Sequence, residues 1–407
     1  MKILHVNKFF DLNGGAEVYM HELMRVQREA GHDVHVLSTR SPANLSSKDA
    51  PRFVARHEMG HSEGPTKDII KAAAFFWNRE AKRAMEEAIR DVKPDVIHLH
   101  NIYHHLSSSI LSPIRKAGIP CVQTLHDLKL ACPNYKMYTE GSPCERCKGG
   151  RYLEAVKHRC LSSGFLPNML AAAEMGFTKV KQSYERTVHT FICPSDFMAE
   201  KMIEWGEPAS KFTVVHSPVP SMDARAVRGG GYLLSVGRLS PEKGYEQLVH
   251  AARSAPDVTI KIAGTGPEED RLRSYIDAHR MTNVELVGFK RGNDLVELYR
   301  NAEAYIACPI GYENLPLAVL DALGYGLPVL ATRIGGLPEM VKDGESGFLV
   351  ARGDTDAWHA TLKRFSVLSS EEKTTMADAS FAHGRDAFPD WSAHEAMIRG
   401  IYEGAVT

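Results

Sequence analysis

Short apolar runs alternate with amphipathic helical patterns along the whole chain. Twelve of these runs have the length and composition of buried strands. The first six are KILHVN, DVHVLST, DVIHLHN, IPCVQTL, HTFICPS and FTVVHS; the second six are YLLSVG, VTIKIAG, VELVGF, AYIACP, PVLAT and GFLV. Strands that alternate with helices form parallel sheets with helices on both faces. The pattern therefore predicts an α/β fold made of two doubly wound, Rossmann-like units.

The length of the chain agrees with more than one domain. At about 100 to 200 residues per domain, 407 residues correspond to roughly two or three domains. Residues 217–231 combine two prolines with a glycine triplet, which is typical of a linker. We therefore expect an N-terminal domain over 1–218 and a C-terminal domain over 225–389. A ligand is expected between them, where the strands of open α/β sheets end.

Composition and charge exclude several classes of protein. The chain is 43% hydrophobic and 24% charged, which predicts an ordered globular protein. Its net charge of −1 gives no general attraction to nucleic acid. No apolar run is long enough to cross a bilayer, and the first residues form a strand pattern instead of a signal peptide. We expect a cytosolic protein.

The segment GYENLPLAVLDALGYGLPVLAT carries two carboxylates around a predicted helix start. Asn314 and Leu315 precede a proline, a residue favoured in the first helical turn, so free backbone N–H groups should point outward and attract an anion. Glu313 would reach the hydroxyls of the molecule that carries the anion, and Asp321 would lie about two turns further along it. This pattern suggests a nucleotide sugar. The simpler alternative is that Glu313 caps the helix and Asp321 is an ordinary polar residue.

A second loop offers cations for the same ligand. The segment YLLSVGRLSPEKGYEQLVHAA is typical of a buried strand, a short loop and a helix, with Arg238 and Lys243 in the loop. Arginine as a planar fork and lysine as a point charge suit a diphosphate. The alternative is a solvated pair of loop residues.

These motifs resemble a known family. GRLSPEKG, ENLPLAVLD, the first 39 residues and the ending DWSAHEAMIRGIYEG are together similar to retaining glycosyltransferases of family 4, of the bacterial surface-glycan type. The resemblance implies the GT-B fold, with two Rossmann-like domains facing across a deep cleft, the first on the acceptor side. It also implies a final helix over 390–407 that rejoins the first domain. One departure concerns Asp321, because the family usually has Glu there; its contact with the ribose could be direct, water-bridged or absent.

The resemblance also implies an activity. It predicts a retaining hexosyltransferase that moves a sugar from a UDP- or GDP-sugar to a hydroxyl of a sugar or lipid-linked glycan, in polysaccharide or glycolipid biosynthesis. No cofactor is expected for catalysis. Two alternatives stay open: an epimerase or hydrolase of the same fold that acts on the nucleotide sugar, and a non-catalytic partner that only binds it. The sequence leaves the oligomeric state open.

In the first half, the resemblance points to two loops at strand ends. Gly14 and Gly15 introduce a helix after the first strand, where glycine lets the backbone approach a ligand or simply forms a turn. By resemblance Gly14, Gly15 and Ala16 face the donor diphosphate. His126 ends the strand IPCVQTL, and the family's histidine at this position contacts the donor sugar and helps to organise the reaction centre. The alternative is a histidine that satisfies backbone groups.

In the second half, the resemblance points to two further loops. Gly264 and Gly266 stand in AGTGPEEDRL, after a strand, but the third glycine of a dinucleotide-binding fingerprint is missing. In the family this loop and the one containing Phe289 and Lys290 flank the base and the ribose. Backbone groups would read the base, which leaves UDP and GDP unresolved.

Four cysteines lie close together in one segment. Cys132, Cys144, Cys147 and Cys160 form a C-x11-C-x2-C-x12-C array. Four thiolates with one close pair fit a tetrahedral structural zinc, and a cytosolic chain disfavours disulfides. His158 could replace one ligand. The alternative is four reduced thiols.

The same segment is rich in basic residues. They are Lys136, Arg146, Lys148, Arg151, Lys157 and Arg159. Such a segment beside the reaction centre could receive an anionic acceptor or touch an acidic membrane from its inner face, and it could equally be a solvated loop.

Two more patterns carry weaker predictions. In HLHNIYHH, strand alternation puts His98 and His100 on one face. A metal site there has little support, because no matching cluster of carboxylates follows. His100 or His104 could instead contact an acceptor. Residues 67–91 are predicted to be helical, with an aromatic cluster that is more typical of a core than of a membrane anchor.

Overall fold

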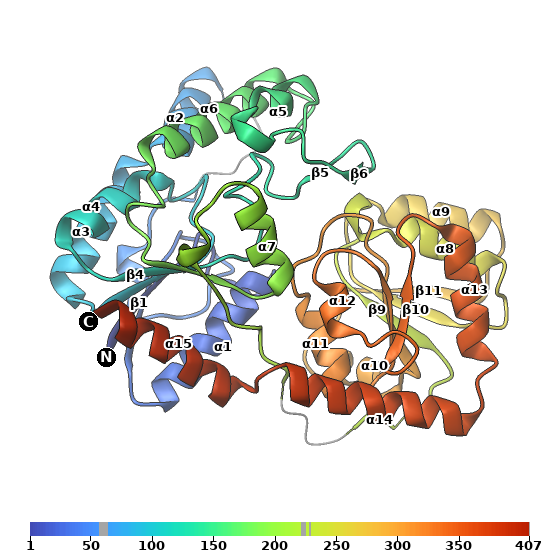
Figure 1. The fold of residues 1–407 in the computed structure, drawn as a ribbon. Helices are drawn as coiled ribbons and strands as arrows, with labels where there is room; N and C mark the ends of the chain where they lie inside the picture. Colours follow the sequence, from blue (N-terminus) through green and yellow to red (C-terminus); the bar gives the residue numbers. More distant parts are fainter. Residues whose placement is uncertain (57–63, 221–224, 228, 407) are drawn as a thin grey trace.

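Two six-stranded parallel sheets, each covered by helices, lie side by side in the protein (Figure 1). The computed structural model describes residues 1–407 except 57–63, 221–224, 228 and 407. Each of the twelve strands predicted from the sequence is present. The prediction of two doubly wound α/β units is therefore confirmed. Part of the linker predicted over 217–231 falls on residues outside those described.

The first sheet has the strand order β2-β1-β3-β4-β7-β8. Its strands are β1 Lys2–Val6, β2 Asp33–Leu37, β3 Val96–Leu99, β4 Cys121–Thr124, β7 Thr190–Cys193 and β8 Phe212–Val214. Its helices are α1 Gly15–Glu29, α2 Pro65–Phe76, α3 Arg79–Val92, α4 Leu111–Ala117, α5 Leu153–Lys157, α6 Phe165–Lys181 and α7 Asp196–Glu204. Central strands such as β3 and β4 are buried at every position, as expected when helices cover both faces of a parallel sheet.

The second sheet has the strand order β11-β10-β9-β12-β13-β14. Its strands are β9 Leu233–Val236, β10 Ile260–Ala263, β11 Val284–Gly288, β12 Ala304–Ala307, β13 Val329–Thr332 and β14 Gly347–Val350. Its helices are α8 Tyr245–Arg253, α9 Glu269–Ala278, α10 Asn293–Asn301, α11 Leu317–Gly324, α12 Leu337–Met340, α13 Thr355–Ser366 and α14 Ser370–Ala387. Apolar side chains form a separate core on each face of this sheet.

The last helix, α15 (Trp391–Val406), returns to the first half and runs beside α1 (Figure 1). Ile398 and Tyr402 of α15 are fully buried against Ile3 and Leu23. The N–H group of Val219 donates to the carbonyl oxygen of the residue at 389, at 2.9 Å, so the two connections between the halves run together.

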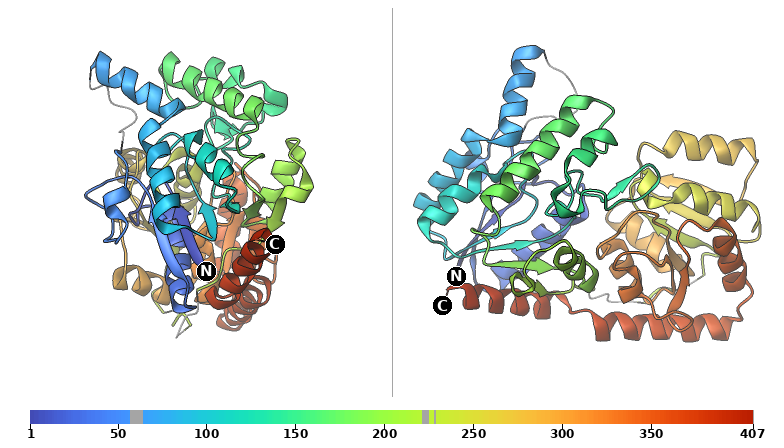
Figure 2. Two further views of the ribbon diagram at one scale, coloured as in Figure 1. Left: turned by 90° about the vertical axis from the view of Figure 1, so that its left-hand side faces the viewer. Right: turned by 45° about the horizontal axis from the view of Figure 1, so that its top comes forward.

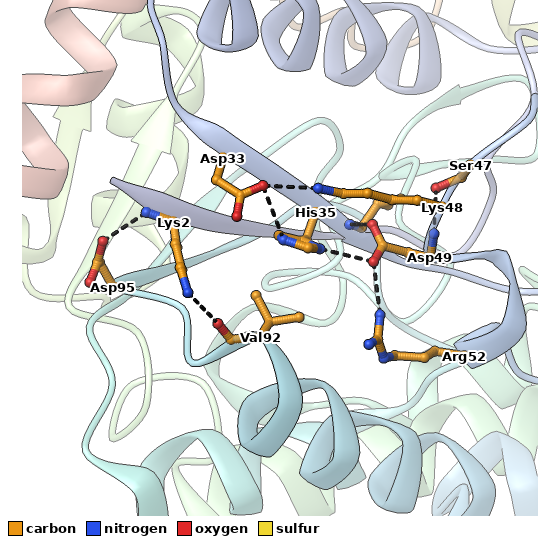
Figure 3. A network of polar contacts seen from close by, with 10 residues as sticks. Lys2, Asp33, His35, Ser47, Lys48, Asp49, Arg52, Val92 and Asp95 are labelled. Carbon is orange, nitrogen blue, oxygen red and sulfur yellow. Dashed lines mark hydrogen bonds and ion pairs between the residues drawn. The ribbon is translucent and has the colours of Figure 1, made fainter.

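A buried aspartate fixes the outer edge of the first sheet. Asp49 accepts hydrogen bonds from the backbone N–H of Val36 at 3.1 Å and from Arg52 at 2.9 Å, and its carboxylate lies 2.9 Å from Nδ1 of His35 (Figure 3). These contacts attach the loop after β2 to the strand itself.

Two local predictions were incomplete. Residues 67–91 do not form one helix, because Asn78 separates α2 from α3 and accepts a hydrogen bond from the N–H of Ala81 at 2.9 Å as an N-cap. The cysteine-containing segment holds an antiparallel hairpin, β5 (Tyr138–Thr139) and β6 (Ser142–Pro143), which the pattern did not predict. None of the described helices is long and apolar enough to span a membrane.

The strand orders locate the crevices of both sheets. In the second sheet the order in which successive strands are added reverses between β9 and β12. In the first sheet it reverses between β1 and β3. Ligands of open α/β sheets bind at such reversals, beyond the carboxyl ends of the strands. The loops after β1 and β3 and after β9 and β12 therefore border the expected crevices, and the loop after β4 follows the strand next to β3.

Candidate active site

An ion pair joins the loops that follow β9 and β12. Lys243 ends a short 3₁₀ turn (Pro241–Lys243), and its Nζ lies 2.6 Å from Oε1 of Glu313. The two side chains are 31% and 15% exposed, so the pair is accessible from the cleft. Burial favours the neutral form of Lys243, but the Glu313 carboxylate outweighs it and raises the pKa of the lysine. Arg238, earlier in the same loop, is exposed and takes part in none of the ion pairs found among the described residues.

Two helix starts, one from each half, face each other beside this pair. Helix α11 begins at Leu317, and α1 begins at Gly15. A Cβ atom added to Gly15 would lie 3.7 Å from Cδ1 of Leu317. The first N–H groups of each helix have no acceptor within the helix, and the helix dipoles make both ends positive. The arrangement suits an anion such as a diphosphate.

Helix α11 differs in detail from the prediction. Pro316 is its N-cap residue and not part of the first turn, so the helix begins one residue later than expected. Asp321 is therefore just over one turn into the helix, not about two turns.

A polar contact across the cleft places Glu313 and His126 near each other. The side chain of Asn314 donates to the carbonyl oxygen of Leu125 at 3.0 Å and accepts from the hydroxyl of Ser195 at 2.5 Å. Leu125 precedes His126, and Asn314 follows Glu313. The Asn314 side chain is used in this contact, and the Leu315 side chain is buried in the core. Both residues can therefore bind a nucleotide-sugar donor only through their backbone groups.

His126 ends a chain of buried histidines. Nδ1 of His100 lies 3.0 Å from Nε2 of His126, and Nε2 of His100 lies 3.0 Å from Nδ1 of His5. Burial lowers the pKa of His126 to about 3 and that of His5 to about 4. The pKa of His100 is lowered well below its usual range for the same reason. All three rings are therefore neutral at physiological pH.

The far end of this chain fixes which nitrogens carry protons. The Gln27 amide donates to the hydroxyl of Tyr402 at 3.1 Å, so its carbonyl oxygen faces Nε2 of His5 at 2.7 Å and accepts from it. Nδ1 of His5 then accepts from Nε2 of His100, and Nδ1 of His100 accepts from Nε2 of His126. This order leaves Nδ1 of His126 as the remaining acceptor of the ring.

The histidine pattern in the sequence is resolved as a hydrogen-bonded array. His98 and His100 share a face, as predicted, and stack at 4.4 Å between ring centroids. With His5 they form a group that could hold a metal ion, but both nitrogens of His98 and of the other two rings already have hydrogen-bond partners. Contact between an acceptor and His100 is excluded, because that side chain is fully buried. His104 stacks on Phe75 at 4.3 Å.

The glycines of the base-side loops have a structural explanation. A Cβ atom at Gly264 would clash with the carbonyl oxygen of Gly237, and one at Gly266 would clash with that of Leu239. These glycines let the loop after β10 pack against the loop that carries Arg238. Their contact with a donor remains a prediction. The same holds for the two residues after β11, of which Phe289 is 59% exposed and Lys290 partly buried.

Asp321 lies partly buried beside a group of tyrosine rings. Burial raises its pKa to about 7; burial also raises the pKa values of Tyr299, Tyr305 and Tyr325, and the Asp321 carboxylate adds a smaller contribution in the same direction. Among the described residues, no cation offsets the burial of this carboxylate. Whether it meets a ribose directly stays a prediction.

Sequence reasoning assigned no role to two charged residues on the first-half wall. Lys8 follows β1, and its Nζ lies 4.4 Å from the ring centroid of Tyr103. Its charge contributes to the low pKa of His126. Burial raises the pKa of Asp127 to about 6, against the opposing effect of Lys8. Their position just after β1 and β4, where ligands of such sheets bind, could have indicated both residues in the sequence.

A further contact between the halves was also missed. The carboxylate of Glu339 in α12 accepts from the backbone N–H groups of Asp196 at 3.0 Å and Phe197 at 2.8 Å. It therefore caps α7 of the other half, which is a contact that no local pattern indicates.

Most basic residues of the cysteine-containing segment are paired. Lys136 lies 2.9 Å from Glu242 and Lys148 2.6 Å from Glu204. The further pairs of this segment are Arg146 with Glu140 and Lys157 with Glu154. Arg151 and Arg159 are exposed. The segment is thus less free to attract an anionic acceptor than its sequence suggested.

Comparisons with known proteins agree with this geometry. The family described as "Glycosyltransferase Family 4" matches residues 13–221, and "Glycosyl transferases group 1" matches 225–379. WcaL of Salmonella typhimurium, named for colanic acid biosynthesis, is 32% identical over 187 residues, 42% of this chain and 46% of WcaL. The chain thus matches about half the length of this curated relative.

Two solved structures share the architecture. Sucrose-phosphate synthase from Thermosynechococcus elongatus superposes with a TM-score of 0.73 at 16% identity, over 99% of this chain and 98% of that one. Anabaena HepE in complex with UDP-glucose superposes with a TM-score of 0.68 at 17% identity, over 99% of this chain and 100% of that one.

These structures have the GT-B fold, so the fold expected from the sequence is confirmed. The family 4 match by itself spans just over half of the chain. The chain therefore belongs to the family 4 type of GT-B glycosyltransferases.

Proposed function

We propose that the protein is a retaining glycosyltransferase that moves a sugar from a nucleoside-diphosphate sugar to a hydroxyl of a sugar or lipid-linked glycan. The observation that carries this proposal is the pairing of two helix starts, at Gly15 and Leu317, beside the Lys243–Glu313 ion pair. The complex of HepE with UDP-glucose favours a UDP-sugar as the first donor to test. The name of WcaL favours polysaccharide biosynthesis as the setting.

The second half supplies the side-chain charge, and both helix starts add backbone N–H groups. As the bond between sugar and phosphate breaks, negative charge builds up on the diphosphate. Lys243, Arg238 and the N–H groups at the helix starts would hold that charge, so the leaving group needs no metal ion. Glu313 would orient Lys243 and accept from hydroxyls of the donor sugar. The ribose would lie toward Asp321.

The first half supplies an uncharged histidine for the donor sugar. With Nε2 of His126 donating to His100, Nδ1 would accept from a hydroxyl of the donor sugar. Retention would follow a front-face path in which the departing phosphate oxygen takes the proton of the acceptor hydroxyl. No protein base is then required.

We also propose that one end of the first half touches a membrane that presents a lipid-linked acceptor. Helices α2, α5 and α6 lie together there (Figure 2). They expose the large apolar side chains Ile69, Ile70, Leu153, Phe165 and Leu166, with Lys157 and Arg159 also exposed nearby. Apolar side chains among cations suit an acidic lipid surface. Co-sedimentation with vesicles rich in phosphatidylglycerol, reduced by Phe165→Ser and Leu166→Ser together, would support this.

The donor is identified by thermal-shift measurements with UDP, GDP, ADP and their common sugar conjugates, with and without EDTA. A ligand of the folded state raises Tm by linkage, so one nucleotide should do so, and EDTA should not change its effect. Product analysis then separates the alternatives. An epimerase or hydrolase converts the stabilising nucleotide sugar without an acceptor, and a non-catalytic partner binds it without turnover across many acceptors.

A further inference from the structure

The four cysteines of the segment between β4 and α6 converge in the structure. Cys147 lies within electrostatic reach of Cys132, Cys144 and Cys160, and Cys160 is also close to Cys132 and Cys144. Cys132 and Cys147 are buried, the other two are partly exposed, and all four are free thiols. The fold therefore gathers residues that are up to 28 positions apart in the sequence.

Backbone groups are arranged around the sulfurs. The N–H groups of Asn134 and Met137 bond to Cys132, and that of Ala155 bonds to Cys147. The Cys132 thiol donates to the side-chain oxygen of Asn134 at 3.1 Å, a contact that deprotonation on metal binding would replace. Asn134 also ties the ends of the array together, since its amide donates to the carbonyl oxygen of Cys160 at 3.3 Å. Hydrogen bonds to sulfur from the surrounding shell are what a metal thiolate site requires.

The backbone of this segment is strained, and its regular structure is short. Of the nine non-glycine residues with positive φ among the described residues, four lie here: Tyr135, Met137, Glu140 and Arg159. Such conformations cost energy and persist only when the surroundings impose them. Two strands of two residues and a helix of five residues are too short to do so alone.

We propose that Cys132, Cys144, Cys147 and Cys160 bind one structural zinc ion, which fixes this segment against the second half. Four cysteines with one C-x2-C pair form a common tetrahedral zinc site. No three of these four sulfurs lie within 4.8 Å of one another, so binding draws the side chains inward. His158 is not needed as a ligand, because its ring lies 2.9 Å from Glu140 and 3.4 Å from Glu154.

The position of the site gives the ion a role beyond local stability. From this segment, Lys136 reaches Glu242 at 2.9 Å, and Glu145 accepts from the hydroxyl of Tyr312 at 3.0 Å. Glu242 and Tyr312 are the direct neighbours of Lys243 and Glu313 in sequence. The zinc-bound segment therefore contacts both loops of the ion pair from the opposite side of the cleft. Through these contacts the four cysteines act as positioning residues for Lys243 and Glu313.

The test is the metal content of the full chain, purified under reducing conditions without chelator and measured by plasma mass spectrometry. We expect one zinc per chain, and none in the double variant Cys144→Ser, Cys147→Ser. The control Cys193→Ala, a cysteine in β7, should keep its zinc. Replacement by Co²⁺ should give the thiolate charge-transfer and visible bands of a tetrahedral sulfur site. Absence of zinc from the reduced, zinc-supplemented wild type, or zinc retained in the double variant, would overturn the proposal.

A second readout covers the case in which the double variant does not fold. In the zinc-loaded wild type, Cys144 and Cys160 should resist alkylation by iodoacetamide, and removal of zinc should make these partly exposed thiols reactive. Equal labelling with and without zinc, or a disulfide among the four, would contradict the site. Neither measurement depends on donor binding, so failure of the zinc proposal and failure of the proposed transferase activity are distinguishable.

Discussion

The two walls of the cleft use different chemistry at equivalent strand ends. In the second half, the loops after β9 and β12 present a charged pair, with Nζ of Lys243 2.6 Å from Glu313. In the first half, the loop after β4 presents His126, which burial keeps neutral and which continues into a chain of neutral rings. Under the proposed transfer, Lys243 and Arg238 of the second half would therefore contribute side-chain charge that stabilises the leaving group. The first half can orient a sugar but cannot act through a protonated His126 at neutral pH.

Removal of the cation from the charged wall should have the largest effect. Lys243→Ala is expected to lower kcat on the order of 10²-fold or more, as for other contacts that stabilise transition-state charge. The matched control is Lys261→Ala, a lysine on β10 of the same half that pairs with Glu285 at 3.9 Å. Steady-state kinetics with the identified donor measure both. Near-normal turnover of Lys243→Ala would show that this lysine does not stabilise the charge of the leaving group.

Removal of the uncharged histidine of the first half should have a smaller effect. His126→Ala is expected to lower kcat roughly five- to tenfold, because a hydrogen bond between uncharged groups contributes about 1 kcal/mol. With its pKa lowered to about 3, His126 should give no inflection in the pH–rate profile of the wild type between pH 5 and 8. An inflection in that range that disappears in His126→Ala would show that the residue titrates during catalysis.

The smallest expected effect is a change in stability on neutralising the buried Asp321. It compares a buried carboxylate, unpaired among the described residues, with the paired carboxylate of Glu313 in the same half. Burial raises the pKa of Asp321 to about 7, so the folded state holds its proton more tightly than the unfolded state. The free energy of unfolding therefore falls as the pH rises from about 4, the ordinary pKa of an aspartate, to about 7, and the full cost of the charged form is present above pH 7. Asp321→Asn should raise Tm by a few degrees at pH 8 and by less at pH 5. Asp277→Asn, an exposed aspartate in α9, is the control. A gain that does not vary with pH would contradict the buried charge.

Features set by local pattern could be predicted from the sequence. The strands follow from runs of apolar residues, and the shared face of His98 and His100 follows from strand alternation. The positions of Lys243 and Glu313 at strand ends were predictable in the same way, although their direct pairing was not.

Features that depend on tertiary contacts could not be predicted. The contact between Asn314 and Leu125 joins residues 189 positions apart, and the capping of α7 by Glu339 joins the two halves. The chain of rings from His5 to His126 likewise exists only once β1, β3 and β4 lie side by side. Sequence spacing carries no information on such contacts, so the use of the Asn314 side chain between the halves could not be foreseen.

The central claim is that the second half binds the diphosphate through charge without a metal ion. Isothermal titration calorimetry tests it most directly, with the stabilising nucleoside diphosphate and the corresponding nucleoside, in EDTA, on the wild type and on Arg238→Ala and Lys243→Ala. We expect the wild type to bind the diphosphate far more tightly than the nucleoside, and each variant to lose most of this difference while nucleoside binding is unchanged. Diphosphate binding that persists in both variants, or that disappears in EDTA, would contradict the central claim.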